Sequence, residues 1–170
     1  MRAFLEETAA LLERGEDLVL ATIAGHAGST PRTSGSKMAV RPGGGILGTI
    51  GGGRLEAVAM ERAGELFERP GAALLRFDLT GREAADAGMI CGGRVLVLLE
   101  HLPATDQSAS LFRGLARAVA AGCAALLLTE YAGADDGLVV KERRAVAAEY
   151  HLDPALDAAL REAGAAAREP

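Results

Sequence analysis

A short segment, Ser36–Ile50, strongly restricts the folds that this chain can adopt. It holds two apolar runs, "SKMAVR" and "ILGTI", separated by "PGGG". Proline followed by clustered glycines favours a tight turn, so the segment is predicted to form a hairpin of two antiparallel strands. Any sheet that the chain builds must therefore contain at least one antiparallel pair.

The rest of the chain alternates between helical and strand-like patterns. Apolar residues recur at helical spacing near the N-terminus, after "GGG" and from about Gln107 to Ala121, and Asp153 with Pro154 is typical of the start of a last helix. The helix after "GGG" is predicted to bury one face and to end by Pro70. Strand-like runs cover residues 17–25, 72–79, 94–102, 124–131 and 137–142. We therefore predict an α/β fold, a mixed sheet flanked by helices, in a single domain spanning residues 1–170.

Composition limits the class of protein. The chain has 170 residues, 49% of them hydrophobic and 24% charged, as in ordinary soluble domains. Its net charge of -5 argues against a general nucleic-acid or membrane surface. The two cysteines, Cys91 and Cys123, suit free thiols in a reducing compartment. Because no leader or membrane span is visible either, we expect a cytoplasmic protein that binds neither nucleic acid nor membrane.

Acidic residues are missing from one long window. No Asp or Glu occurs from Leu18 to Leu55, although the chain carries 23 acids. Four cations fall inside the window: Arg32, Lys37, Arg41 and Arg54. The window therefore predicts a local positive field, suited to an anionic ligand, on a protein that is acidic overall.

The glycines Gly51–Gly53 stand at the start of a predicted helix. Such a turn is expected to leave backbone N–H groups free, and the helix dipole adds positive charge at the same end. Ser29 and Thr30 supply hydroxyl groups from the preceding loop. These features favour anion binding, with the alternative that a hairpin and a helix cap need small polar residues anyway.

Other motifs are less specific. Gly43, Gly45 and Gly48 match G-x-G-x-x-G, but no helix is predicted to follow, so the dinucleotide fingerprint lacks its context. In "GMICGG", Cys91 is either a thiol open to a ligand or a small buried side chain at the start of a strand. The three histidines are isolated in sequence, so no protein-held metal site is predicted.

Three motifs together resemble one family. "GSTPRTSGSKM", "GTIGGGRLE" and "GMICGG", within residues 28–93, are similar to the N-terminal domain of the XdhC/CoxI family. These proteins are accessory factors of xanthine dehydrogenase and of aerobic carbon monoxide dehydrogenase. The resemblance implies a cofactor chaperone rather than an enzyme. Its cargo would be the molybdenum cofactor (molybdopterin), sulfurated with a cysteine desulfurase and inserted into a xanthine dehydrogenase-type molybdenum hydroxylase.

The resemblance also suggests roles for particular residues. Under it, the phosphate and oxo groups of the cofactor would be held by Ser29, Thr30, Arg32, Lys37, Gly51, Gly52 and Gly53. Cys91 would face the molybdenum or the sulfur that is exchanged.

The chain departs from the family in one respect. Full-length members continue into a dinucleotide-binding domain, and no such pattern follows Glu149, so we expect none here and consider a separate dinucleotide-binding subunit as partner. A homodimer is a further option. Two other functions stay open: a thiol-dependent sulfurtransferase that uses Cys91 as nucleophile, and a docking module without a small-molecule ligand.

Overall fold

The structure is a computed structural model that describes residues 1–79, 93–123, 125–133 and 138–147. Its helices and strands alternate much as the sequence predicts. In chain order they are α1 (Arg2–Glu13), β1 (Leu18–Ala27), β2 (Lys37–Val40), β3 (Ile46–Gly48), α2 (Gly53–Glu68), β4 (Ala72–Asp78), β5 (Arg94–Leu102), α4 (Asp106–Ala120), β6 (Ala125–Ala132) and β7 (Val139–Ala147).

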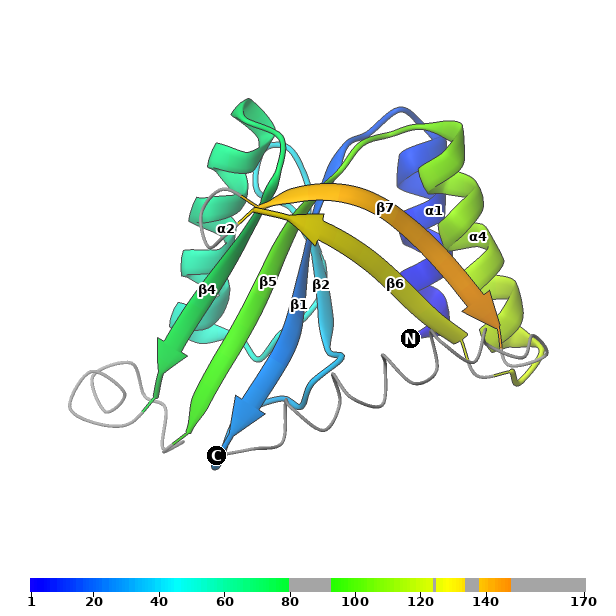
Figure 1. Cartoon of the computed structure of the whole chain (residues 1–170). Helices are drawn as coiled ribbons and strands as arrows, with labels where there is room; N and C mark the ends of the chain where they lie inside the picture. The colour runs from blue at the N-terminus through cyan, green and yellow to red at the C-terminus, as the bar shows by residue number, and fades with distance from the viewer. Residues whose placement is uncertain (80–92, 124, 134–137, 148–170) are drawn as a thin grey trace.

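A five-stranded sheet with the order β3-β2-β1-β5-β4 forms the centre of the molecule (Figure 1). The predicted hairpin is confirmed: β2 and β3 pair antiparallel with Met38 opposite Gly48. The prediction of an α/β protein with a sheet flanked by helices is also confirmed. The structure refines it, because the pairings between the strands it describes are all antiparallel.

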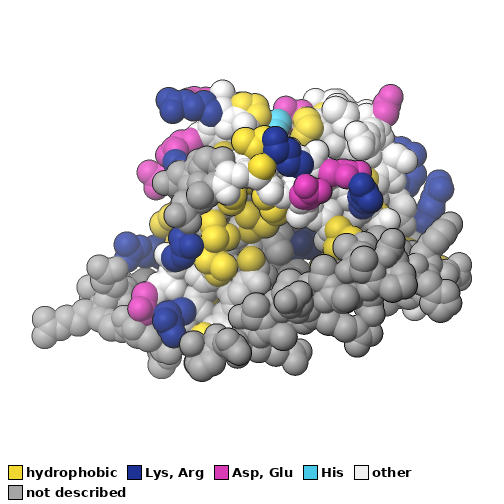
Figure 2. Space-filling view, viewed as in Figure 1, with side chains coloured by type: hydrophobic (Ala, Val, Ile, Leu, Met, Phe, Trp, Pro, Cys, Tyr) yellow, Lys and Arg dark blue, Asp and Glu magenta, His cyan; other side chains and the backbone are white. Residues whose placement is uncertain are grey.

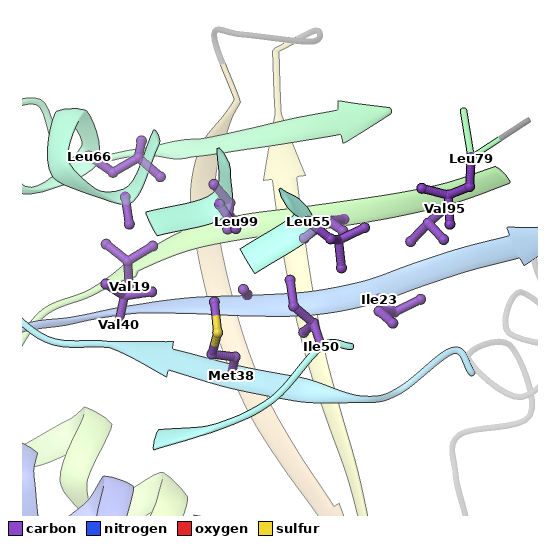
Figure 3. Packing of buried hydrophobic residues seen from close by; sticks show 14 residues of the cluster. Val19, Ile23, Met38, Val40, Ile50, Leu55, Leu66, Leu79, Val95 and Leu99 are labelled. Atoms are coloured by element: carbon purple, nitrogen blue, oxygen red, sulfur yellow. The ribbon is translucent and has the colours of Figure 1, made fainter. Parts of the chain in front are cut away.

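Helix α2 covers one face of this sheet. Its buried residues are Leu55, Ala59, Ala63 and Leu66, one side of the helix as the spacing predicts. They pack against Val19 and Met38 and other side chains of β1, β2 and β5 in a cluster of apolar residues (Figure 3). Burial of this helix face fixes where α2 begins, and therefore where the Gly51–Gly53 turn lies.

The opposite face is covered in its upper half by α1, α4 and the β6–β7 hairpin, which arches across the sheet in Figure 1. Helices α1 and α4 share a second apolar cluster with Leu18, Leu20 and Ala39 of the sheet. Of the α4 residues predicted to face inward, Leu115 is buried, and Leu111 and Val119 are partly buried against the same cluster.

Three predictions fall outside the described residues: the loop 80–92 with Cys91, the turn at 134–137 and the helix that Asp153 would begin. Among the helices that the structure describes, none has the length and apolar character needed to span a bilayer.

Candidate functional site: where the three motifs meet

The first and second motifs touch at Gly51. This residue has φ +131°, a conformation that side chains rarely adopt. A Cβ atom placed on it would lie 3.0 Å from Cβ of Pro31 and 3.7 Å from Cγ of Arg32. The loop that carries Arg32 therefore lies directly against the turn that begins α2, as the predicted anion site requires.

The third motif reaches the first through its last residue, Gly93. Gly93 is buried at the start of β5. A Cβ atom there would lie only 2.5 Å from the carbonyl oxygen of Ala27, 2.6 Å from that of Ser29 and 2.8 Å from Cγ2 of Thr30. Such distances exclude any side chain at this position. The three motifs thus converge at one end of the sheet, whereas Cys91 itself lies outside the described residues.

The backbone N–H groups of the glycine turn are occupied by a carboxylate from the same chain. Oε1 of Glu56 accepts hydrogen bonds from the N–H groups of Gly52 at 2.9 Å, Ile50 at 3.0 Å and Gly51 at 3.3 Å. The hydroxyl of Thr49 donates to the same oxygen at 2.5 Å. The expectation of free N–H groups is therefore wrong for Gly51 and Gly52, because the first acid after the acid-free window folds back onto them.

The environment of Glu56 shows what this turn is built to hold. Burial alone raises the pKa of its carboxyl group, but hydrogen bonds from Thr49 and from the backbone of Gly52, Ile50 and Gly51 outweigh that effect, and the pKa is lowered. The turn therefore stabilises a negatively charged oxygen. A sequence signal existed, because an acid in the first turn of a helix commonly reaches back to the N–H groups at its start.

The cations of the acid-free window do not all reach this junction. Arg32 is exposed and lies beside Gly51. Arg41 is held elsewhere, since its Nη2 donates to Oε2 of Glu16 at 2.8 Å. The side chain of Lys37 is directed to β1, where its Nζ donates to the hydroxyl of Thr22 at 2.9 Å. Of these three side chains, the structure brings only that of Arg32 to the glycine turn.

Lys37 instead belongs to a polar cluster on the sheet face opposite α2. Its neighbours in sequence show this: Met38 and Val40 pack with α2, and Ala39 packs with α1 and α4 on the other side. Burial is the main cause that lowers the pKa of Lys37, and the negative charge of Glu100 partly opposes it.

Glu100 stands at the centre of that cluster, and no pattern in the sequence predicted its role. Its side chain is 3% exposed and accepts a hydrogen bond at 3.1 Å from Nε of Arg143, which is 13% exposed. Nη2 of Arg143 also donates to the carbonyl oxygen of His101 at 2.8 Å. These contacts attach the β6–β7 hairpin to the main sheet, so this cluster has a structural role.

Residues 11–78, which contain the first two motifs, match the XdhC and CoxI family. The matched range includes Ser29, Thr30, Arg32 and the Gly51–Gly53 turn, so the junction between the first two motifs lies within that range. In the part of the chain that the structure describes, no three His, Cys, Asp or Glu side chains gather into a metal-binding group.

Two further comparisons show similarity to known proteins. An uncharacterized protein of Escherichia coli (strain K12), YqeB, is 32% identical over 129 residues, which are 76% of this chain and 24% of that protein. A crystal structure described as a xanthine dehydrogenase from Bacillus halodurans superimposes with a TM-score of 0.63 at 22% identity, over 88% of this chain and 47% of that chain. The latter likeness shows a shared fold. This chain spans about a quarter of the first protein and about half of the second.

Proposed function

We propose that this chain is an accessory factor that binds the molybdenum cofactor as cargo and assists its sulfuration and its insertion into a xanthine dehydrogenase-type molybdenum hydroxylase. The observation that carries the proposal is the meeting of the three motifs, in which Gly51 lies against Pro31 and Arg32, and Gly93 lies against Ser29 and Thr30. The match to the XdhC and CoxI family over residues 11–78 supports the same role.

The chemistry of the junction fits a phosphate or oxo group. The turn already holds one carboxylate oxygen with three backbone N–H groups and one hydroxyl. Arg32 adds a guanidinium group, whose planar set of donors suits phosphate. A cofactor oxygen would either bind beside Glu56, between Arg32 and the loop hydroxyls, or replace its carboxylate on the turn.

Cargo binding is tested by titrating the purified chain with molybdopterin and following pterin fluorescence. Arg32→Ala removes the cation at the junction, and we expect an affinity loss of about tenfold or more, as for other charge-assisted contacts. Lys37→Met, whose side chain lies on the opposite face, is the matched control and should bind as the wild type does. If the wild type and Arg32→Ala bound molybdopterin equally well, the junction would not be the cofactor-binding site.

Delivery requires a second assay. Apo-hydroxylase is incubated with cofactor, a cysteine desulfurase and this chain, and recovered hydroxylase activity is measured. We expect recovery to rise with wild-type chain and to rise less with Arg32→Ala. A chain that binds cofactor but never raises recovery would be a carrier without a role in insertion.

A further inference from the structure

A cavity of about 450 Å³ adjoins the motif junction, on the side of the sheet away from α2. It lies where β1 and β4 end and β5 begins, at the lower end of the sheet in Figure 1. Ala27 lines it, and the same residue contacts Gly93 at the junction through its carbonyl oxygen. The cavity and the oxyanion turn therefore lie on either side of one short segment of chain.

The walls of this cavity suit a flat ring. Gly25 and Ala27 of β1 present little or no side chain, and the partly buried Leu96 of β5 lies opposite Gly25. Figure 2 shows hydrophobic side chains gathered on this face of the molecule, below the β6–β7 hairpin. The lining also includes His26, Phe77 and Val95. Together with Leu96 and the strand backbone, Phe77 and Val95 offer an apolar surface on which an aromatic ring can bury area.

The open space at Gly25 is not required by the fold. A Cβ atom there would lie 3.8 Å from Cβ of Leu96, an ordinary contact, and Gly25 is not among the glycines with positive φ. An alanine would therefore fit the strand and occupy part of the cavity. Glycine at this position leaves space that none of the described residues fills.

Charged groups line the rim of the cavity. Arg76 and Asp78 project from β4, and Arg94 of β5 stands directly opposite Asp78. Arg76 and Asp78 already interact with other groups, which holds them in place. A guanidinium group has five donors and a carboxylate about four acceptor positions, so groups of this kind can contact more than one partner at a time. A carboxylate accepts two parallel hydrogen bonds from a ring edge that carries N–H and NH2 groups, and guanidinium groups stack on aromatic faces.

We propose that this cavity binds the 2-aminopyrimidin-4-one ring of the cargo, with Asp78 reading its amino edge and Arg76 and Arg94 bordering the ring. This inference rests on the proposed function and names the subsite for the planar part of the ligand. Two sources share that edge chemistry, the pterin of the cofactor and the guanine of a nucleotide form of it.

The test uses the full chain and three probes: pterin-6-carboxylate, guanosine monophosphate and lumazine, a pteridine without the 2-amino group. We expect pterin or guanosine monophosphate to bind at least about tenfold more tightly than lumazine, the loss that follows when a charged acceptor lacks its donor. Asp78→Asn should reduce that preference. Tighter binding of pterin would identify the pterin as occupant, and tighter binding of guanosine monophosphate the nucleotide base.

Gly25→Val fills the cavity and should weaken binding of the preferred probe about tenfold or more, with an unchanged melting temperature. Gly25→Ala is the milder variant if valine disturbs the strand. Gly64→Ala, on α2 with no atom within 4 Å of the new Cβ, is the matched control and should bind normally. Unchanged binding in both Gly25 variants, or equal binding of lumazine, would overturn the inference.

The outcomes separate this inference from the proposed function. If whole cofactor binds, is lost in Arg32→Ala and is retained in Gly25→Val, the function stands and the cavity assignment falls. If the isolated ring binds in a way that depends on Gly25 while whole cofactor does not bind, the cavity assignment stands and the function falls.

Discussion

Two glutamates, Glu56 and Glu100, are held by the fold in contrasting ways. Glu56 is bound by backbone N–H groups and a hydroxyl no more than seven positions away in the chain. Glu100 is bound by the side chain of Arg143, 43 positions away, and is almost completely buried. The first arrangement is a partly exposed turn that stabilises a carboxylate, whereas the second attaches one sheet to the other. The difference separates a candidate binding site from a structural contact.

The largest effect is expected when the buried pair is broken. Arg143→Met leaves the carboxylate of Glu100 buried without its partner, which should lower the free energy of unfolding by about 3 kcal/mol or more. Urea denaturation measures it. Arg144→Met is the matched control, because Arg144 is 67% exposed and pairs with Glu142, and its loss should change stability by less than about 1 kcal/mol. Equal losses in both variants would show that Glu100 does not depend on Arg143.

A smaller effect is expected at the turn. Glu56→Ala removes the shared acceptor of three backbone N–H groups, and partial access of water limits the loss to about 2 kcal/mol. Glu61→Ala, on the exposed side of the same helix, should stay within about 0.5 kcal/mol of the wild type. If the two variants were equally stable, the hydrogen bonds to Glu56 would contribute nothing.

The same residue predicts a pH dependence. Because the pKa of Glu56 is lowered from 4.5 by folding, its contribution is complete above that value and is lost as the pH falls through the folded-state pKa. The stability difference between wild type and Glu56→Gln should therefore shrink between pH 6 and pH 3, about the range over which such a carboxyl titrates. A difference that stays constant over this range would contradict the assignment.

The smallest effect concerns Lys37. Folding lowers its pKa from 10.5, chiefly through burial, so the unfolded chain binds the proton more readily and stability rises with pH as 10.5 is approached. Relative to Lys37→Met, the wild type should become more stable between about pH 7 and pH 10. Lys141→Met, at an exposed side chain, controls for removal of a lysine. A wild type that loses stability relative to Lys37→Met over this range would reverse the predicted sign.

Local features of this molecule could be predicted from the sequence, and long-range ones could not. The hairpin of β2 and β3 and the buried face of α2 follow from turn residues and spacing within about fifteen positions. The register of β2 decides which face of the sheet the side chain of Lys37 points to. The pairing of Glu100 with Arg143 depends on how the distant β6–β7 hairpin lies across the sheet. Neither leaves a pattern along the chain. Glu56 is intermediate, because its position in the first helical turn follows from the sequence, whereas the return of its carboxylate onto Gly51 and Gly52 depends on the conformation of the turn.

The central claim is that the three motifs form one binding site, and Gly93→Ala tests it most directly. The added Cβ would collide with the carbonyl oxygens of Ala27 and Ser29 and displace the first motif while leaving Arg32 and Glu56 unchanged in sequence. The measurement is the dissociation constant for molybdopterin, with circular dichroism to confirm cooperative unfolding and Gly64→Ala as the control. We predict an affinity loss of about tenfold or more in folded Gly93→Ala. Wild-type affinity in that variant would contradict the account.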